Sequence, residues 1–276
     1  MNGKVIITGA SGAMGEAATR ELAKDGHSIL MACRNLQKVE TVRKRILSDL
    51  PDADISIGQI DLTSLGSVQA FVDRLGSDPV TALFNNAGTI SRASSLTVDG
   101  LENTFSVNYF APVLLTRLLL PRMTPDAMIV NMISLTCRYV KVTDESLQPK
   151  PKDFSQLGTY ARSKLALLRF SQELARRHPE IRVNLADPGI VNSNMIDLGH
   201  WFDPLADAVF KPFCKSPERG VQPALTALRS MERNRYFVGN RCLEIPRKFD
   251  NPETDVSLWQ ATDSIFSKKS VYLGTC

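Results

Sequence analysis

Short apolar segments rich in β-branched residues alternate along this chain with segments of helical periodicity. The apolar runs are nearly continuous, which is typical of strands that are buried on both faces of a parallel sheet. These expected strands cover residues 5–8, 29–32, 55–60, 82–84, 128–133 and 181–185. The expected helices between them cover residues 15–24, 36–50, 64–75, 100–123 and 159–178. The pattern therefore predicts an α/β chain.

The alternation predicts one domain rather than several. Strands joined by right-handed helical crossovers form a single-domain, Rossmann-type doubly wound parallel sheet with helices on both faces. We assign residues 1–246 to this domain and expect the tail, residues 247–276, to pack on it. Two irregular segments, residues 136–158 and 191–217, interrupt the alternation. Irregular segments of this length are usually functional loops, and we interpret residues 191–217 as a substrate loop.

The composition excludes several function classes. The chain has 276 residues, with 33 Lys and Arg against 29 Asp and Glu and 43% hydrophobic residues, as in an ordinary globular domain. The charges are dispersed and only 7% of residues are aromatic, so nucleic acid is not an expected partner. Five cysteines without C-x-x-C spacing and three separated histidines show no metal or disulfide pattern and favour a cytoplasmic location. The most apolar stretch, residues 112–123, contains Arg117 and Arg122, so no membrane span is expected.

A glycine-rich turn, residues 8–15, directly follows the first expected strand and opens the first helix. Backbone N–H groups with no Cβ in the way, together with the positive end of a helix dipole, bind a pyrophosphate. The residues expected to contact the cofactor here are Gly9, Ser11, Gly12, Met14 and Gly15. A purely structural turn is the alternative, because a glycine motif alone is weak evidence.

The end of the second strand is where a dinucleotide-binding fold places the residue that reads the adenosine ribose. The sequence there is Cys33-Arg34-Asn35, which offers a guanidinium where NAD binders use a carboxylate. Arginine pairs bidentately with a 2′-phosphate, so the expected cofactor is NADP(H), bound by Arg34 and Asn35. Ser11 and Lys38 are weaker candidates for the same phosphate. The alternative is that Arg34 is a solvated charge at the strand end.

A tyrosine and a lysine, Tyr160 and Lys164, stand four residues apart at the start of the fifth expected helix. They share one helix face, and an ammonium one turn away favours the phenolate and lowers the pKa of the phenol. Together with the glycine turn and with Asn-Asn-Ala-Gly at residues 85–88, this motif resembles the short-chain dehydrogenase/reductase family. The resemblance extends over residues 4–242.

The resemblance implies a catalytic role for four residues. Ser134 matches the serine that hydrogen-bonds the substrate oxygen, Tyr160 the general acid or base, and Lys164 the residue that tunes Tyr160 and holds the nicotinamide ribose. Asn108 matches the asparagine that completes the tetrad. Pro112, four residues on, has no N–H to donate to the Asn108 carbonyl, which leaves that oxygen free for a water of a proton relay. The alternative is that Asn108 is only a polar helix residue beside a kink.

The resemblance also implies further cofactor contacts. Asp61 and Leu62 match the pair that flanks the adenine. The motif after the fourth strand and the loop that holds the nicotinamide amide contribute Asn85, Ala87, Gly88, Pro188, Gly189, Val191 and Ser193.

Three features depart from the family pattern. Ala13 stands where a glycine is usual, Ile133 replaces a common serine, and the insert between Ser134 and Tyr160 is longer than in most relatives. With that insert, the sequence is most similar to the retinol dehydrogenase-like group.

The resemblance implies an NADP(H)-dependent oxidoreductase that interconverts a carbonyl and an alcohol. Apolar residues of the substrate loop, among them Trp201, Phe202 and Phe210, favour a lipophilic small molecule, unless they pack on the domain or on a partner subunit. A non-catalytic NADP-binding sensor or scaffold protein is the rival function. The leucine-rich helices 100–123 and 159–178 are more apolar than one sheet face requires, so a homodimer or homotetramer is expected.

Overall fold

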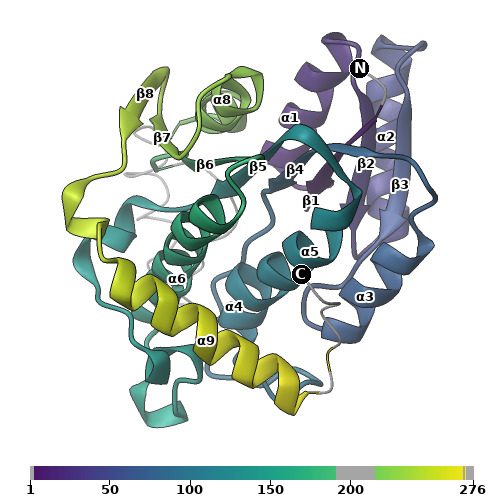
Figure 1. The fold of residues 1–276 in the computed structure, drawn as a ribbon. Coiled ribbons are helices and arrows are strands. Elements are labelled where there is room, and N and C mark those ends of the chain that lie inside the picture. The colour runs from purple at the N-terminus through teal and green to yellow at the C-terminus, as the bar shows by residue number, and fades with distance from the viewer. Residues whose placement is uncertain (1–2, 191–214, 270, 272–276) are drawn as a thin grey trace, which may run out of the picture.

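The central sheet has the strand order of a doubly wound fold. The computed structural model describes residues 3–190, 215–269 and 271 (Figure 1). The strands are β1 (Lys4–Thr8), β2 (Ser28–Cys33), β3 (Ile55–Gln59), β4 (Val80–Asn85), β5 (Met123–Met132), β6 (Arg182–Asp187), β7 (Arg235–Val238) and β8 (Arg241–Glu244). They lie in the order β3-β2-β1-β4-β5-β6-β7-β8, and every pair is parallel except β7 with β8. The predicted fold class is therefore confirmed.

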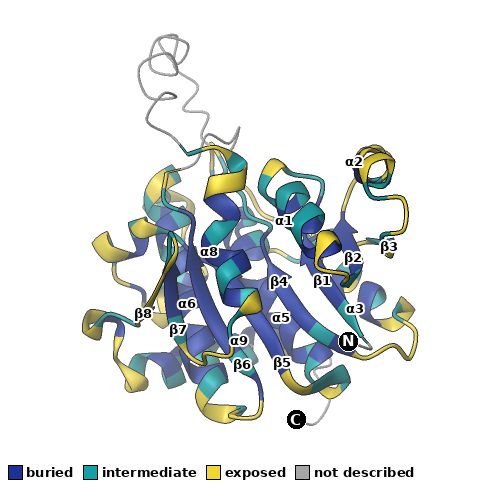
Figure 2. Ribbon diagram, turned by 90° about the horizontal axis from the view of Figure 1, so that it is seen from above, coloured by how far each residue is buried: buried dark blue, intermediate teal, exposed yellow. Residues whose placement is uncertain are grey.

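Helices cover both faces of the sheet (Figure 2). They are α1 (Ala13–Lys24), α2 (Leu36–Asp49), α3 (Leu65–Arg74), α4 (Asn103–Phe105), α5 (Ala111–Leu119), α6 (Gln156–Arg177), α8 (Pro217–Arg229) and α9 (Pro252–Lys268). One buried apolar cluster joins the sheet to α1, α2 and α8, and a second joins its other face to α3, α5 and α6. The buried residues of α3, Leu65, Val68, Phe71 and Val72, illustrate the spacing of three and four that turns one helix face to the core.

The helix expected over residues 100–123 is divided into shorter pieces. A π-helical turn, Ser106–Phe110, separates α4 from α5, and in it the Ala111 N–H donates to the Ser106 carbonyl five residues back. Pro112 follows directly and has no N–H with which to continue α-helical pairing to the residue four before it. The next strand already begins at Met123, so the predicted helix is wrong at its C-terminal end.

The helix α9 packs on α6 and on the π-helical turn before α5, and it crosses the front of the molecule in Figure 1. The hydroxyl oxygens of Tyr109 and Thr262 lie 2.6 Å apart, and both residues are buried. The rings of Phe110 and Phe266 pack edge to face, with centroids 6.0 Å apart. The sequence analysis does not predict this helix.

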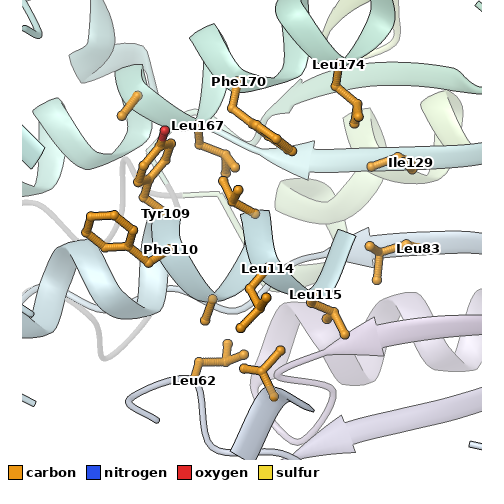
Figure 3. Close-up of a cluster of buried hydrophobic side chains, with 14 of the residues drawn as sticks. Leu62, Leu83, Tyr109, Phe110, Leu114, Leu115, Ile129, Leu167, Phe170 and Leu174 are labelled. Carbon is orange, nitrogen blue, oxygen red and sulfur yellow. The ribbon is translucent and has the colours of Figure 1, made fainter. Parts of the chain in front are cut away.

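The leucines from which the sequence analysis infers a second subunit lie in this core. Leu114 and Leu115 are fully buried (Figure 3), and so is Leu119. The surplus apolar surface is thus covered within the chain, in part by α9. Leu118 and Leu120 are only partly buried, and the homodimer or homotetramer stays a prediction. No helix within the described residues is long and apolar enough to cross a membrane.

Candidate active site

A cavity of about 540 Å³ opens beyond the carboxyl ends of β1 to β4. In an open α/β sheet this edge binds the ligand, because the strand order reverses there. The cavity brings together many of the residues expected at the cofactor site, namely Gly9, Ser11, Arg34, Asn35, Lys38, Asp61, Leu62, Ala87 and Gly88. The sequence-based placement of the adenosine end is consistent with this geometry.

The glycine turn has the close packing that a pyrophosphate cradle requires. Gly9 adopts a positive φ of 65°, which favours glycine. A Cβ on Gly15 would lie only 2.4 Å from the Gly9 carbonyl oxygen, so no larger residue fits without moving backbone. Gly12 is the N-cap of α1, and the unexpected Ala13 is the exposed first residue of that helix. The alanine therefore does not obstruct the turn, and the first N–H groups of α1 face the edge where a phosphate would bind.

The end of β2 presents two cations to the cavity. Arg34 and Lys38 are both exposed and line it. Among the described residues, neither side chain forms a hydrogen bond or ion pair. The Asn35 side chain accepts from the Lys38 N–H at 2.8 Å and caps α2. This hydrogen bond fixes the start of the helix that carries Lys38, next to Arg34. The arrangement suits a phosphate next to the adenosine ribose.

Two further cavity residues are held by local hydrogen bonds. The Asp61 carboxylate accepts from the N–H and hydroxyl of Thr63 at 2.9 and 2.8 Å, which fixes the turn after β3. The Cys33 sulfur accepts from the Ser11 N–H at 3.3 Å and ties the glycine turn to the end of β2. The sequence analysis did not assign a role to Cys33, and its spacing in the sequence offers no signal for one.

The Ser134, Tyr160 and Lys164 side chains come together at the carboxyl end of β5. Ser134 follows β5 by two residues, its hydroxyl accepts from the Thr136 hydroxyl at 2.9 Å, and it is near enough to Tyr160 to affect the pKa of the phenol. Lys164 lies one turn further along α6, is 2% exposed, and its Nζ donates to the Met132 carbonyl at 2.9 Å. A Cβ on Gly88 would lie 3.4 Å from that Nζ, so the lysine also borders the cofactor cavity. The structure thus links the expected catalytic residues to the expected cofactor site.

Burial controls the titration of this pair. It raises the pKa of Tyr160 to about 12, although the nearby Ser134 hydroxyl lowers that pKa. Burial also lowers the pKa of Lys164 to about 8. Desolvation of the phenol is the largest influence on the Tyr160 pKa, and the lowering expected from Lys164 stays a prediction.

Asn108 lies in the π-helical turn, fully buried beside Lys164. Its Nδ2 donates to the Thr89 carbonyl at 2.9 Å and to Ser163 Oγ at 3.0 Å, while its Oδ1 accepts from the Thr89 N–H at 2.8 Å. The side chain therefore fastens the loop after β4 to α6. π-helical turns of this kind are frequent at functional sites. Ser163, which also donates to the Tyr160 carbonyl at 2.7 Å, is a positioning residue that the sequence analysis missed.

The side chain of Asn85 does not reach the cavity. It is buried and donates to Asn131 Oδ1 at 2.8 Å and to Thr116 Oγ1 at 3.2 Å, which joins β4 to β5 and α5. The neighbouring Asn86 donates to the Thr8 carbonyl at 2.8 Å and ties the end of β4 to β1. The side chain of Asn85 is thus used within the sheet, and the cofactor contact expected of this residue stays a prediction.

The loop after β6 is described only in its first residues. Gly189 has a positive φ of 72° and donates its N–H to Asp187 Oδ1 at 2.9 Å, and Lys215 Nζ donates to the Pro188 carbonyl at 3.2 Å. Val191, Ser193 and most of the predicted substrate loop lie outside the described residues. Asp187 was not predicted, and no sequence motif marks it.

Comparisons with known proteins agree with this geometry. A family model for short chain dehydrogenase matches residues 3–198. Retinol dehydrogenase 12 of Mus musculus is 31% identical over 268 residues, which are 94% of this chain and 84% of that protein. The WW domain-containing oxidoreductase of Danio rerio is 30% identical over 287 residues, which are 96% of this chain and 69% of that protein.

Solved structures show the same fold. A crystal structure of a protein from Mycobacterium paratuberculosis matches with a TM-score of 0.78 and 26% identity, over 99% of this chain and 95% of that one. A short-chain dehydrogenase from Sphingobium yanoikuyae in complex with NADPH matches with a TM-score of 0.68 and 22% identity, over 96% and 95% of the two chains.

Proposed function

This chain belongs to the short-chain dehydrogenase family and is similar to retinol dehydrogenases, and from this premise we propose an NADP(H)-dependent oxidoreductase that interconverts a carbonyl and an alcohol on a lipophilic small molecule. The observation that carries the proposal is the position of Lys164, which is buried one turn after Tyr160, is held by the Met132 carbonyl at the end of β5, and adjoins Gly88 of the cofactor cavity. Family membership shows an oxidoreductase fold, while the catalytic residues, the cofactor preference and the substrate are our proposals.

In the proposed reaction, Ser134 donates a hydrogen bond to the substrate oxygen and holds it beside Tyr160. A nicotinamide cofactor held by the glycine turn and Lys164 would supply the hydride chemistry that interconverts carbonyl and alcohol. Tyr160 donates its phenolic proton to the same oxygen in reduction and takes it back in oxidation. Lys164, held by the Met132 carbonyl, places a positive charge where it stabilises the phenolate that forms.

The preference for NADP(H) rests on the end of β2. Arg34 and Lys38 offer two cations without a protein partner among the described residues, and a 2′-phosphate would satisfy both. The NADPH complex of the Sphingobium yanoikuyae relative supports this choice by analogy.

A lipophilic substrate is supported by the surroundings of the reacting groups. Leu135, Leu157 and Ile190 are large apolar side chains that remain 37%, 51% and 66% exposed. Leu135 follows Ser134, Leu157 is one helical turn before Tyr160, and Ile190 follows the Gly189 turn, so all three come from segments that border the site. The similarity to retinol dehydrogenases favours the same class of substrate.

The test is NADPH oxidation with a panel of ketones, aldehydes and retinoids. We expect turnover with bulky apolar carbonyls, and we expect Tyr160→Phe to reduce it about 10²- to 10⁴-fold while NADPH still binds. Tyr139→Phe removes a hydroxyl from a residue that is 80% exposed and serves as the matched control. Tight NADPH binding with no turnover across the panel would instead support the rival function, a sensor or scaffold protein.

A cytoplasmic location and assembly into a homodimer or homotetramer also remain proposals. The composition supports the first. Cell fractionation tests the location, and sedimentation tests the assembly.

A further inference from the structure

A lysine just before α8 holds the turn that follows β6. Lys215 donates its backbone N–H to the Ile190 carbonyl at 2.9 Å, and its Nζ donates to the Pro188 carbonyl at 3.2 Å. Pro188 is buried and Lys215 is partly buried. One backbone and one side-chain hydrogen bond therefore join Lys215 to residues 188–190, although Pro188 and Lys215 are 27 residues apart in the sequence.

The side chain of Lys215 lies against Gly189. Gly189 has a positive φ of 72°, and a Cβ added to it would lie 3.0 Å from Lys215 Nζ and 3.5 Å from Lys215 Cε. The Gly189 N–H donates to Asp187 Oδ1 at 2.9 Å, and Asp187 is 2% exposed. The turn is thus fixed by a buried carboxylate and by Lys215, and the missing Cβ of Gly189 lets the ammonium approach its backbone.

The Lys215 ammonium has hydrogen-bonding capacity that the protein does not use. An ammonium carries three N–H donors, and among the described residues only the Pro188 carbonyl accepts from it. No carboxylate in the part of the chain that the structure describes forms an ion pair with Lys215. A partly buried cation with free donors suits an anionic group of a bound ligand.

The packing of α8 brings this cation to the proposed cofactor site. The helices α1 and α8 lie side by side on one face of the sheet (Figure 2). Ala13 and Pro217, the first residues of these helices, line one cavity of about 360 Å³. Lys215 precedes Pro217 by two residues, so it lies near the first turn of α1, whose N–H groups we assign to the pyrophosphate.

The strand order assigns Lys215 to the nicotinamide half of that cofactor. Arg34 and Lys38 lie at the end of β2, whereas the turn that Lys215 holds lies at the end of β6. The strands β1, β4 and β5 stand between β2 and β6 in the sheet. The cations at β2 and the cation at β6 therefore serve opposite ends of a dinucleotide that lies across this edge.

We propose that the Lys215 ammonium binds the phosphate that adjoins the nicotinamide ribose in the diphosphate of NADP(H), while it holds the Pro188–Gly189 turn in place. The inference rests on the proposed function, because it assigns Lys215 to the cofactor of that reaction. Each phosphate of a diphosphate carries negative charge, whereas the dipole of α1 supplies only about half of one positive charge. A cation beside the first turn of α1 supplies the remainder.

The experiment measures the Kd of three ligands that contain different parts of the cofactor. They are NADPH, 2′-phospho-ADP-ribose, which lacks the nicotinamide, and adenosine 2′,5′-bisphosphate, which also lacks the second phosphate of the diphosphate. Lys215→Met removes the charge and keeps an unbranched side chain. We expect it to weaken the first two ligands about 10-fold, through loss of one charge-assisted hydrogen bond at a partly exposed site, and the third less than about 2-fold.

Two variants serve as controls in calorimetry. Lys215→Arg retains the positive charge and should restore most of the lost affinity. Lys268→Met removes an exposed lysine at the end of α9 and should change none of the three Kd values. If Lys215→Met does not fold, Lys215→Gln removes the same charge and decides in its place.

The pattern over the three ligands decides the proposal. Weakening of NADPH and 2′-phospho-ADP-ribose with unchanged adenosine 2′,5′-bisphosphate supports it. Weakening of NADPH alone overturns it, because Lys215 would then act only through the nicotinamide turn. Equal weakening of all three ligands by a folded variant, or no weakening, also overturns it.

The binding assay separates this inference from the proposed function. If the expected pattern is found but no carbonyl or alcohol is turned over, the proposed activity fails and the assignment of Lys215 stands. If wild type prefers NADH, the same comparison with NADH, ADP-ribose and AMP tests Lys215, although the proposed cofactor preference has failed. If wild type binds neither dinucleotide, both proposals are overturned.

Discussion

Arg34 provides the sharpest test of the cofactor assignment. Arg34→Asp replaces a cation at the end of β2 by the carboxylate that suits a free ribose 2′-hydroxyl. A hydrogen bond to a charged group contributes about 1.5 to 3 kcal/mol, which corresponds to a roughly 10- to 100-fold change in affinity. Arg34 is exposed and lines the cavity beside Lys38, so solvent screening places the expected change toward the lower end of this range.

The assay is the Kd of NADPH and of NADH, measured by calorimetry at two ionic strengths. We expect wild type to prefer NADPH, Arg34→Asp to weaken NADPH and reverse the preference, and the difference to shrink as salt rises. Arg241→Asp, an exposed position on β8 at the far edge of the sheet, is the matched control. Equal affinity of wild type for both cofactors, or an unchanged ratio in Arg34→Asp, would refute the assignment.

Three further predictions follow from the packing. Gly15→Ala should abolish NADPH binding, because the added Cβ would lie 2.4 Å from the Gly9 carbonyl oxygen. Gly76→Ala is the control and should bind NADPH normally, because its Cβ would have no neighbouring atom within 4 Å. NADPH binding by Gly15→Ala would contradict the assignment of the glycine turn to the pyrophosphate. Asp255→Asn should lower the free energy of unfolding, measured by urea titration, by about 3 kcal/mol, because it leaves buried Arg169 without its ion pair. A decrease in the free energy of unfolding of less than about 1 kcal/mol would contradict this role of the ion pair. Sedimentation should show an assembly larger than 30.5 kDa if the proposed oligomer forms, and a species of only that mass at micromolar concentration would reject it.

The sheet could be predicted from the sequence largely because its strands are buried on both faces. Runs such as Val5–Ile7 are apolar at every position, which is typical of a strand that is covered on both faces of a parallel sheet. The last two strands escaped prediction because β8 is exposed at all four positions and β7 is equally short, so neither forms a recognisable apolar run. The helix α9 was missed because it meets the rest of the chain through contacts such as that of Thr262 with Tyr109 in the π-helical turn, which are distant in sequence.

The candidate active site could likewise be predicted only in part from the sequence. Gly9, Gly15 and the Tyr160–Lys164 pair occur in local motifs, and the structure places them together at one edge of the sheet. The partners that position them do not share a motif. Asp187 meets its donor Tyr236 from another strand, so only the folded chain reveals that contact. The burial that raises the pKa of Tyr160 could not be predicted either, because it depends on packing and not on spacing.

The most direct test of the central claim is the transfer of hydrogen from cofactor to substrate. The enzyme would be incubated with NADPH deuterated at C4 of the nicotinamide and with the apolar ketone or aldehyde that gives the fastest turnover. The account predicts an alcohol product that carries deuterium on the former carbonyl carbon, and no such product from Tyr160→Phe beyond the residual rate. An alcohol formed without deuterium when either face of the nicotinamide carries the label, or labelled product at an undiminished rate from Tyr160→Phe, would contradict it.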